Sequence, residues 1–494
     1  MRTFFRVFIF LLPLAAWAHL GSPDVYYDGN AGPYHLLVTI RPPAVVPGVA
    51  QILVRSYSTA GEIDRIQILP LTIEGEGENL APRPDAMVRS ADDPQLYTGN
   101  LWIMLRGSWK VRVQVEGKQG DSEINVPVAA VSLTAAHMDR GTSLMLGGFG
   151  LLLVVGLVGI LRAANGPAQV LPKQSMSPTL KRRSMVGMSI GAIFILVVLV
   201  SGDLWWNTEA TANETMVYRV PELQAQLKAP GVLKITLENP NSRSFGDNQW
   251  RNFWAQSVVL NDLVPDHGHL MHLFLVSMPD MKSFWHLHPD ATGAQEFVTK
   301  LPAMPPGRYR VYADVVHSTG FPETEVGTID LPAVGGEPDP SLGGDDSGSP
   351  ALVASDKIAA LSSGYRMIWE RDPSPLRAQQ AVIFRFRIED KDGRPATDLE
   401  NYMGMAAHAV FLSDDGKVFA HVHPQGSVSM AALALAQGST RGSASPMGSM
   451  SMAPLPAEVS FPYGFPQPGD YHFFVQVKRA GHVETGMFVA HAVE

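Results

Sequence analysis

The stretch His408-Ala-Val-Phe-Leu-Ser-Asp-Asp-Gly-Lys-Val-Phe-Ala-His-Val-His-Pro424 reads as two apolar strands joined by a short turn. Asp415-Gly416 between two such runs favours a two-residue type I′ hairpin turn. That turn would place His408 opposite His423, with His421 on the same face. Because cross-strand partners and alternate residues share a face, the three imidazoles are predicted to project from one side of the hairpin.

The chain contains this pattern twice. The copies share an Asp-Leu pair, a His ten residues after the Asp, a His-x-His-Pro element and a Pro-Gly-x-Tyr element: Asp262-Leu263, His272, His286–Pro289 and Pro306–Tyr309, then Asp398-Leu399, His408, His421–Pro424 and Pro468–Tyr471. The first loop has one more residue, and centring its hairpin on Asp280 again places His272 opposite His288. A one-residue slip would turn His272 to the other face. We therefore predict two hairpins, each with three converging histidines.

Three neutral imidazoles suit zinc, copper, nickel or iron, and nearby thioethers favour Cu(I). Methionines occur close to the second histidine set and in a Ser/Gly/Ala/Met-rich insertion that follows it. Copper, as Cu(I) or Cu(II), is therefore the predicted ion, with zinc as the alternative. The predicted ligands are His272, His286, His288, His408, His421 and His423, and the auxiliary candidates are His19, His267, His269, Met403, Met405, Met447, Met450 and Met452.

The same residues have plainer interpretations. A histidine on a strand is often a packed or surface residue, and a Met-bearing Ser/Gly run is usually a flexible loop. Methionine also serves as adaptable apolar filler. Three histidines that converge twice favour metal binding over these alternatives.

Charge and composition exclude several classes of function. The net charge is −9 and no long basic block occurs, so nucleic acid is not an expected partner. The chain has no cysteine, which excludes a blue-copper electron-transfer centre, since that centre needs a Cys ligand. No Ser/His/Asp spacing, phosphate-binding loop or paired acid motif stands out, so no enzyme activity is predicted. A copper oxygenase built on His19 remains an open alternative.

Three apolar segments indicate an exported, membrane-anchored chain. Residues 1–18 have the charged start, apolar stretch and Ala-x-Ala end of a signal peptide, which would make His19 the mature N-terminus. Residues 141–161 and 184–203 are long enough to span a bilayer. The loop 162–183 is basic and is therefore predicted to be cytoplasmic. This topology predicts a bacterial inner-membrane protein with both terminal portions in the periplasm, and the lipid bilayer as a partner.

Short strands with turn signals predict a mainly β chain. We expect three Ig-like or cupredoxin-like β-sandwich domains beside the two transmembrane helices. The predicted domains cover residues 19–136, 207–335 and 353–494. Residues 336–352, rich in Gly, Pro and acidic residues, are expected to form a flexible linker, and about 427–456 to form the Met/Ser/Gly-rich insertion.

Residues 262–315 and 398–489 resemble bacterial periplasmic domains of the YtkA/FixH-like type, which occur beside copper-resistance genes. The resemblance rests on His272 with Phe284–Pro289, on His408 with Phe419–Pro424, and on the Pro-Gly-x-Tyr elements that follow. The N-terminal domain is similar in outline to the copper-resistance C (CopC) family, which binds copper through an N-terminal His. These resemblances imply metal handling at the cell envelope.

The sequence therefore predicts an envelope protein that buffers copper, delivers it or confers resistance to it. A copper exporter or another envelope copper protein would be its partner. The alternative is an adhesion, sensor or scaffold protein of tandem β-sandwiches, in which the histidines only pack.

Overall fold

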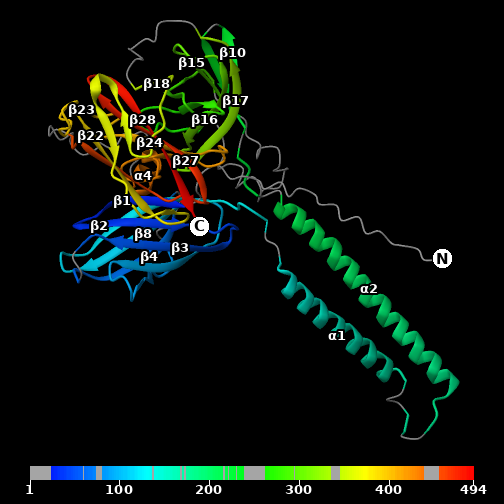
Figure 1. The fold of residues 1–494 in the computed structure, drawn as a ribbon. Coiled ribbons are helices and arrows are strands. Elements are labelled where there is room, and N and C mark those ends of the chain that lie inside the picture. Colours follow the sequence, from blue (N-terminus) through cyan, green and yellow to red (C-terminus); the bar gives the residue numbers. More distant parts are fainter. Residues whose placement is uncertain are drawn as a thin grey trace, which may run out of the picture. The chain divides into compact units, whose positions relative to one another are not determined.

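The protein is mainly β, with two long apolar helices, as the sequence predicts (Figure 1). The structure is a computed structural model. It describes residues 24–58, 61–73, 81–135, 138–166, 170–171, 174–214, 217–220, 222–229, 231–237, 262–293, 295–334, 345–438 and 455–494. The predicted signal peptide, His19, Met447, Met450 and Met452 lie outside these residues.

The N-terminal domain consists of two antiparallel sheets. They have the strand orders β1-β2-β3-β7-β6 and β5-β4-β8-β9. The strands are β1 (Val25–Ala31), β2 (Tyr34–Arg41), β3 (Gly48–Ser56), β4 (Ile63–Thr72), β5 (Asp85–Ala86), β6 (Val88–Arg89), β7 (Leu96–Ile103), β8 (Gly107–Gly117) and β9 (Ser122–Ala130). Inward-facing aliphatic residues such as Ile52, Ile68 and Val113 are fully buried between them.

The first histidine-bearing domain also has two sheets, ordered β10-β11-β15-β14 and β17-β16-β12-β13-β18. Its strands are β10 (Gln224–Ala229), β11 (Val232–Thr236), β12 (His272–Met278), β13 (Phe284–Leu287), β14 (Asp290–Ala291), β15 (Glu296–Lys300), β16 (Gly307–Val316), β17 (Pro322–Leu331) and β18 (Ser347–Ser349). Strand β18 corrects one prediction, because Ser347 pairs with His286 and so part of the expected flexible linker is an edge strand.

The second histidine-bearing domain pairs the sheet β19-β20-β22-β26 with the sheet β21-β28-β27-β24-β25, to which β23 adds. Its elements are β19 (Ile358–Ala360), η2 (Ser362–Gly364), β20 (Arg366–Trp369), β21 (Leu376–Arg377), β22 (Val382–Glu389), β23 (Leu399–Glu400), β24 (His408–Ser413), β25 (Phe419–Val422), α4 (Met430–Ala436), β26 (Glu458–Tyr463), β27 (Gly469–Arg479) and β28 (His482–Val493). Helix α4 lies within the predicted insertion, at residues for which no helix was predicted.

The predicted register of both hairpins is confirmed. Phe274 of β12 lies opposite His286 of β13, and Val410 of β24 lies opposite His421 of β25. The predicted type I′ turn is wrong. Only Gly416 has a positive φ in the loop Asp414–Lys417, whereas a type I′ turn needs two such residues. The register is unaffected, because a four-residue loop centred on the same bond leaves every strand pair unchanged.

The two histidine-bearing domains pack together through an apolar layer that we call the interdomain cluster. Within β12, Leu273 and Leu275 belong to the domain's own core, whereas Phe274 and Val276 belong to this layer. Strand β24 divides its residues in the same alternating way. The interdomain cluster consists of Phe274, Val276, Met281, Phe284, Tyr312, Val410, Leu412, Phe419, Phe474 and Met487.

Along their strands, His272 and His408 are an even number of residues away from the residues of the interdomain cluster. Alternate residues of a strand share a face, so both histidines project away from their own cores and toward the other domain. The two histidine sets therefore meet at one interface, a point that the sequence left open.

The N-terminal domain packs against the segment that follows His423. Val428 and Leu433 lie in the N-terminal core, and Tyr27 forms a β-bridge with Gly426. Any side chain at Gly426 would collide with the Tyr26 carbonyl oxygen, since an added Cβ would lie 1.9 Å from it. The N-terminal domain is thus joined to the loop that leaves the second histidine set.

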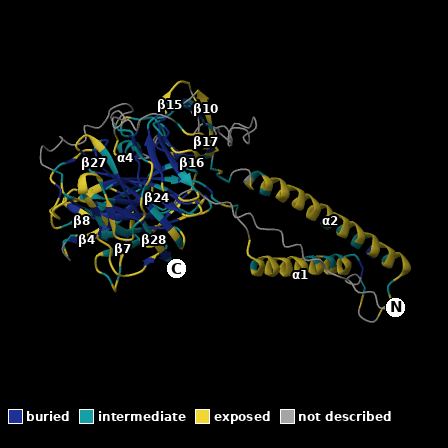
Figure 2. Cartoon of the chain, turned by 45° about the horizontal axis from the view of Figure 1, so that its top comes forward, coloured by how far each residue is buried: buried dark blue, intermediate teal, exposed yellow. Residues whose placement is uncertain are grey.

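The segment 132–218 is a separate unit that holds α1 (Arg140–Ala164) and α2 (Pro178–Glu214). Both helices are long and apolar enough to cross a membrane, and they are exposed along their length (Figure 2). They extend beyond the predicted spans, and α2 includes Lys181, Arg182 and Arg183, residues that favour helix. Gly187 and Gly191 allow the helices to approach closely at Asn165 and Leu161.

Candidate metal centre

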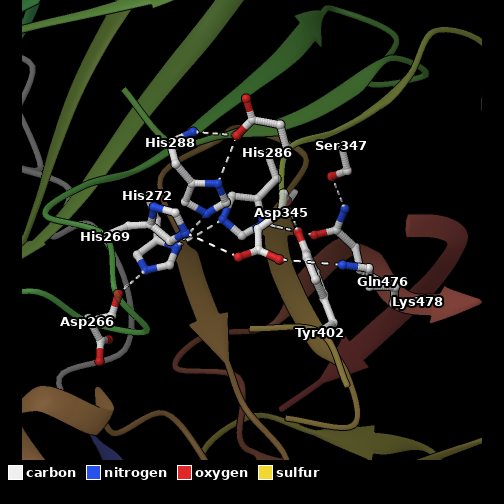
Figure 3. A network of polar contacts seen from close by, with 11 residues as sticks. Asp266, His269, His272, His286, His288, Asp345, Ser347, Tyr402, Gln476 and Lys478 are labelled. Carbon is white, nitrogen blue, oxygen red and sulfur yellow. Dashed lines mark hydrogen bonds and ion pairs between the residues drawn. The ribbon is translucent and has the colours of Figure 1, made fainter. Parts of the chain in front are cut away.

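His272, His286 and His288 form one cluster, which we call triad 1, at the interface described above (Figure 3). His272 and His286 are buried, and the side chain of His288 is only 3% exposed. His272 Nδ1 lies 3.0 Å from His286 Nε2 and 3.2 Å from His288 Nε2. A tetrahedral ion with metal–nitrogen bonds of about 2.0–2.1 Å separates its ligand nitrogens by about 3.3–3.4 Å. The two separations are thus slightly shorter than those between ligands of one ion, and all three nitrogens lie within 4.8 Å of one another.

Each histidine of triad 1 has one ring nitrogen that faces the other two histidines (the inward nitrogen) and one that faces away from them (the outward nitrogen). All three outward nitrogens meet hydrogen-bond acceptors. His272 Nε2 lies 3.2 Å from the Asp266 carbonyl oxygen, and His288 Nδ1 lies 2.9 Å from a carboxylate oxygen of Asp346. His286 Nδ1 lies 3.0 Å from Gln476 Oε1. If each outward nitrogen carries the proton that it donates, each inward nitrogen of a neutral ring carries a lone pair. A metal-ligating His commonly donates its other N–H in this way.

Protonation of these imidazoles, which would remove the repulsion between their lone pairs, is unfavourable. Burial lowers the pKa of His272 and of His286 well below the usual range, and the neighbouring imidazoles lower both further. Burial also lowers the pKa of His288, although the Asp346 carboxylate opposes this shift. Neutral imidazoles are the form that binds metal.

The second cluster, which we call triad 2, differs from the prediction. It contains His408 and His423 as expected, but its third member is His267 from the first domain, and not His421. His267 Nε2 lies 3.2 Å from His423 Nε2. Their Nδ1 atoms face the carbonyl oxygens of Met403 and Val428, at 2.9 and 3.2 Å.

His408, the remaining member of triad 2, is buried, and neither of its ring nitrogens has a hydrogen-bond partner. A buried polar group without a partner is costly, unless another group satisfies it. A metal ion bound by triad 2 would satisfy one of these two nitrogens.

A tight turn places His267 in the partner domain's cluster. Asp266 and His269 exchange backbone hydrogen bonds across it, and His267 and Gly268 have φ of 51° and 89°. These values make a type I′ turn, which sequence reasoning had placed at Asp415-Gly416. The second copy repeats the turn at the aligned positions, where Met403 and Gly404 have φ of 49° and 78°.

The other candidates occupy distinct places around the triads. His269 stacks on His288 with ring centroids 3.9 Å apart, and its Nε2 lies 3.4 Å from an Asp345 carboxylate oxygen. Met403 and Met405 are buried at the second type I′ turn. His421 belongs to neither triad, although its ring lies near both.

Sequence reasoning missed two residues that the pairing of the domains brings to the histidines. Asp314 and Gln476 lie opposite His272 and His408 on β16 and β27. Asp314 accepts from His421 Nδ1 across the interface, at 3.2 Å, as Gln476 does from His286. Both residues follow the Tyr of Pro-Gly-x-Tyr by five positions, and this shared spacing could have indicated them.

Asp345, Asp346 and Tyr402 were also missed. The two aspartates fall in the expected linker, which carried no structural signal. The Tyr402 hydroxyl lies 3.1 Å from His286 Nδ1 and donates to the Asp345 carbonyl oxygen at 3.0 Å.

A second polar cluster shows the same repetition with different chemistry. In the first copy, His317 is fully buried between Asp262 and Glu323, at 2.8 and 3.2 Å. Burial opposes charge on this ring, but the two carboxylates outweigh it and raise the pKa of His317 to about 9. In the second copy, Arg479 takes the aligned place between Asp398 and Glu484.

The family whose model matches the chain is described as "Domain of unknown function (DUF8832)", and the match covers residues 234–329 and 360–494. These ranges include the six predicted histidine ligands. No curated protein matches the chain. The predicted resemblance to YtkA/FixH-like and CopC proteins is untested by these findings and stays a prediction.

Several solved β-rich structures are similar over most of the chain. A tetra-tandem repeat from the extending region of a large adhesion protein has a TM-score of 0.15 and 7% identity, covering 95% of this chain and 74% of that one. The Escherichia coli adhesin FdeC has a TM-score of 0.15 and 10% identity, covering 96% and 98%. E. coli alpha-2-macroglobulin has a TM-score of 0.20 and 11% identity, covering 96% and 22%.

Proposed function

We propose that this chain is a membrane-anchored protein that binds transition-metal ions at the interface between its two histidine-bearing domains. Triad 1 (His272, His286, His288) and triad 2 (His267, His408, His423) would each bind one ion. Binding would serve to buffer the ion, deliver it or protect the cell from it.

The observation that carries this proposal is the arrangement of hydrogen bonds in triad 1. All three outward nitrogens meet acceptors, so in neutral rings the three inward nitrogens carry lone pairs, although His272 Nδ1 lies only 3.0 Å from His286 Nε2 and 3.2 Å from His288 Nε2. Histidines that only pack would be expected to pair a donor with an acceptor at such distances. A cation at the centre removes the repulsion, and Asp346 and Gln476 keep the rings oriented for it.

Copper is the ion that we propose first. Met403 and Met405 occupy in the second copy the turn positions that His267 and His269 hold in the first, and thioethers favour Cu(I). Zinc is the alternative, since the imidazoles alone suit it equally well.

The membrane placement is part of the proposal. Two membrane-crossing helices would leave both terminal portions on the same side of the membrane. The basic residues Lys181, Arg182 and Arg183, near the start of the second helix, favour the extracytoplasmic side for those portions. The metal-binding domains would then face the periplasm of a bacterial inner membrane. A copper exporter or another envelope copper protein is the proposed partner.

Metal analysis of the full chain in detergent tests this function. The protein would be dialysed against limiting Cu(I), Cu(II) or Zn(II), beside the variants His288→Ala and His408→Ala. We expect close to two ions per wild-type chain and one ion in each variant. His491→Ala is the matched control, because this exposed histidine also pairs with a carboxylate and should leave both ions in place.

A chain that binds no metal would overturn the proposal. The histidines would then be packing residues, and the chain would be an adhesion, sensor or scaffold protein of tandem β-sandwiches. The observation that favours this second candidate is the continuous packing of all three domains through the interdomain cluster and α4.

A further inference from the structure

One buried imidazole lies between the triads and belongs to neither. The ring centroid of His421 is 4.5 Å from that of His423 and 5.5 Å from that of His408, on the side of triad 2. It is also 5.2 Å from the centroid of His272, in triad 1. Ring centroids within the triads are 4.6–5.3 Å apart, so His421 is almost as close to both triads as their members are to one another.

The hydrogen bonding of His421 leaves one nitrogen available. Its Nδ1 lies 3.2 Å from an Asp314 carboxylate oxygen, which accepts a hydrogen bond from it. Its Nε2 is buried and has no hydrogen-bond partner. The side chain is only 3% exposed, so solvent does not satisfy this atom. In the neutral ring that donates to Asp314, Nε2 carries a buried lone pair beside two clusters that resemble metal sites.

His286, the aligned residue of the first copy, shows the contrast. Its Nδ1 also meets a residue of the other domain, Gln476, but its Nε2 lies 3.0 Å from His272 and belongs to triad 1. In the second copy, His267 takes the corresponding place in triad 2, because it crosses from the first domain. This crossing leaves His421 as an additional imidazole at the centre of the interface.

We propose that His421 is a relay ligand through which a metal ion passes between triad 1 and triad 2. This inference rests on the proposed metal-binding function. In each step of the transfer, one metal–nitrogen bond to a triad member breaks as one to His421 Nε2 forms. The ion keeps its oxidation state, and the Nδ1 proton stays on the hydrogen bond to Asp314. The ligand class is a d¹⁰ ion that tolerates changing imidazole coordination, Cu(I) above all.

The test compares the wild-type chain with His421→Asn. Asparagine can place its amide nitrogen near the position of the imidazole Nδ1 and so keep the hydrogen bond to Asp314, while it removes Nε2. Both full-length proteins, labelled with ¹⁵N at histidine, would be given one equivalent of Cu(I) in detergent without oxygen. Exchange spectroscopy on the imidazole signals of His288 and His408 then measures how fast the ion moves between the triads. His491→Asn is the matched control.

In the wild type we expect exchange at a rate that does not depend on protein concentration. His421→Asn should still bind two ions at saturation, but the exchange should slow by about tenfold or more, a barrier increase of at least about 1.4 kcal/mol. Unchanged exchange in the variant would overturn the relay, as would a wild type without exchange. Loss of one ion in His421→Asn would make His421 a permanent ligand and also overturn it. A wild type that binds no Cu(I) would instead show that the proposed copper binding itself has failed.

If His421→Asn does not fold, His421→Gln provides the second test. Glutamine reaches the position of Nε2 but binds these ions weakly, so the same slowing of exchange is expected, and exchange at the wild-type rate would overturn the relay.

Discussion

The two histidine-bearing copies share one hairpin register but build their triads differently. Triad 1 takes all three histidines from its own hairpin, whereas triad 2 takes two from its hairpin and His267 from the other domain. The difference follows from one aligned turn position, which is His267 in the first copy and Met403 in the second. A duplicated motif therefore need not give duplicated sites, because the turns at His267 and Met403 also lie at the interface with the other domain.

This difference also makes the two triads depend differently on domain pairing. Triad 1 is complete within one hairpin, although Gln476 of the other domain orients His286. Triad 2 exists only while the two domains remain packed. Four perturbations, given in order of expected effect, test how the two histidine-bearing copies differ.

The interdomain cluster should have the largest effect. Phe474 is fully buried and stacks on Phe284 across the interface, with ring centroids 4.4 Å apart. Phe474→Ala should lower the free energy of unfolding by about 3–5 kcal/mol, because a large cavity opens in the packing. Denaturant unfolding of the metal-free chain measures this. Val353→Ala, at a position 81% exposed, should change it by less than about 0.5 kcal/mol.

The same variant should lose the ion of triad 2 before that of triad 1, because only triad 2 needs His267 to cross the interface. Metal analysis of Phe474→Ala that shows equal loss from both triads would contradict this asymmetry.

The loss of stability at alkaline pH should come from His317, in the first histidine-bearing domain. The pKa of His317 is raised from 6.5 to about 9 in the folded state. Its stabilisation is thus fully present below pH 6.5 and is lost as the pH rises through about 9, by an amount on the order of 3 kcal/mol. Denaturant unfolding from pH 6 to pH 10 measures the loss. Arg479, at the aligned place, stays charged throughout this range.

His317→Gln should remove most of this pH dependence, since glutamine does not titrate. His491→Gln is the control, because this exposed histidine should leave the pH profile as it is in the wild type. A profile unchanged in His317→Gln would assign the dependence to other groups.

Substitution of His267, but not of Met403, should reduce the stabilisation of the folded chain by bound metal. An ion at a free concentration 100 times its dissociation constant stabilises the folded chain by about 2.7 kcal/mol per site. His267→Ala should lose one such contribution and one bound ion, because triad 2 is left with two ligands. Met403→Ala should keep both ions. Thermal unfolding with and without Cu(I) measures the difference, and loss of an ion from Met403→Ala would make that thioether a ligand.

The outward partners of triad 1 should have the smallest effect. Asp346→Ala removes the acceptor of His288 Nδ1 and should weaken the affinity of triad 1 by about 10–100-fold. Triad 2 should keep its affinity. Competition with a chelator of known affinity measures both. Asp280→Ala, in the loop of the same hairpin, is the matched control, and an equal loss there would point to the hairpin and not to the hydrogen bond.

Local patterns in the sequence determined the strand content, the two apolar helices and the register of both hairpins. Strand register follows from a two-residue period and from burial of one face, and both can be read along the chain. The runs His272–Met278 and His408–Ser413 contain one more signal. They are apolar on nearly every residue, as strands are when both faces are buried.

Only the tertiary structure decided which histidines belong together. The direction of His267, the exclusion of His421 from triad 2 and the approach of Asp346 to His288 all depend on how two sheets and an edge strand pack. These contacts join residues that are far apart in sequence, such as His267 and His423. The physical reason is that period and register are set by neighbours along the chain and across one hairpin, whereas a shared site is set by the packing of whole domains.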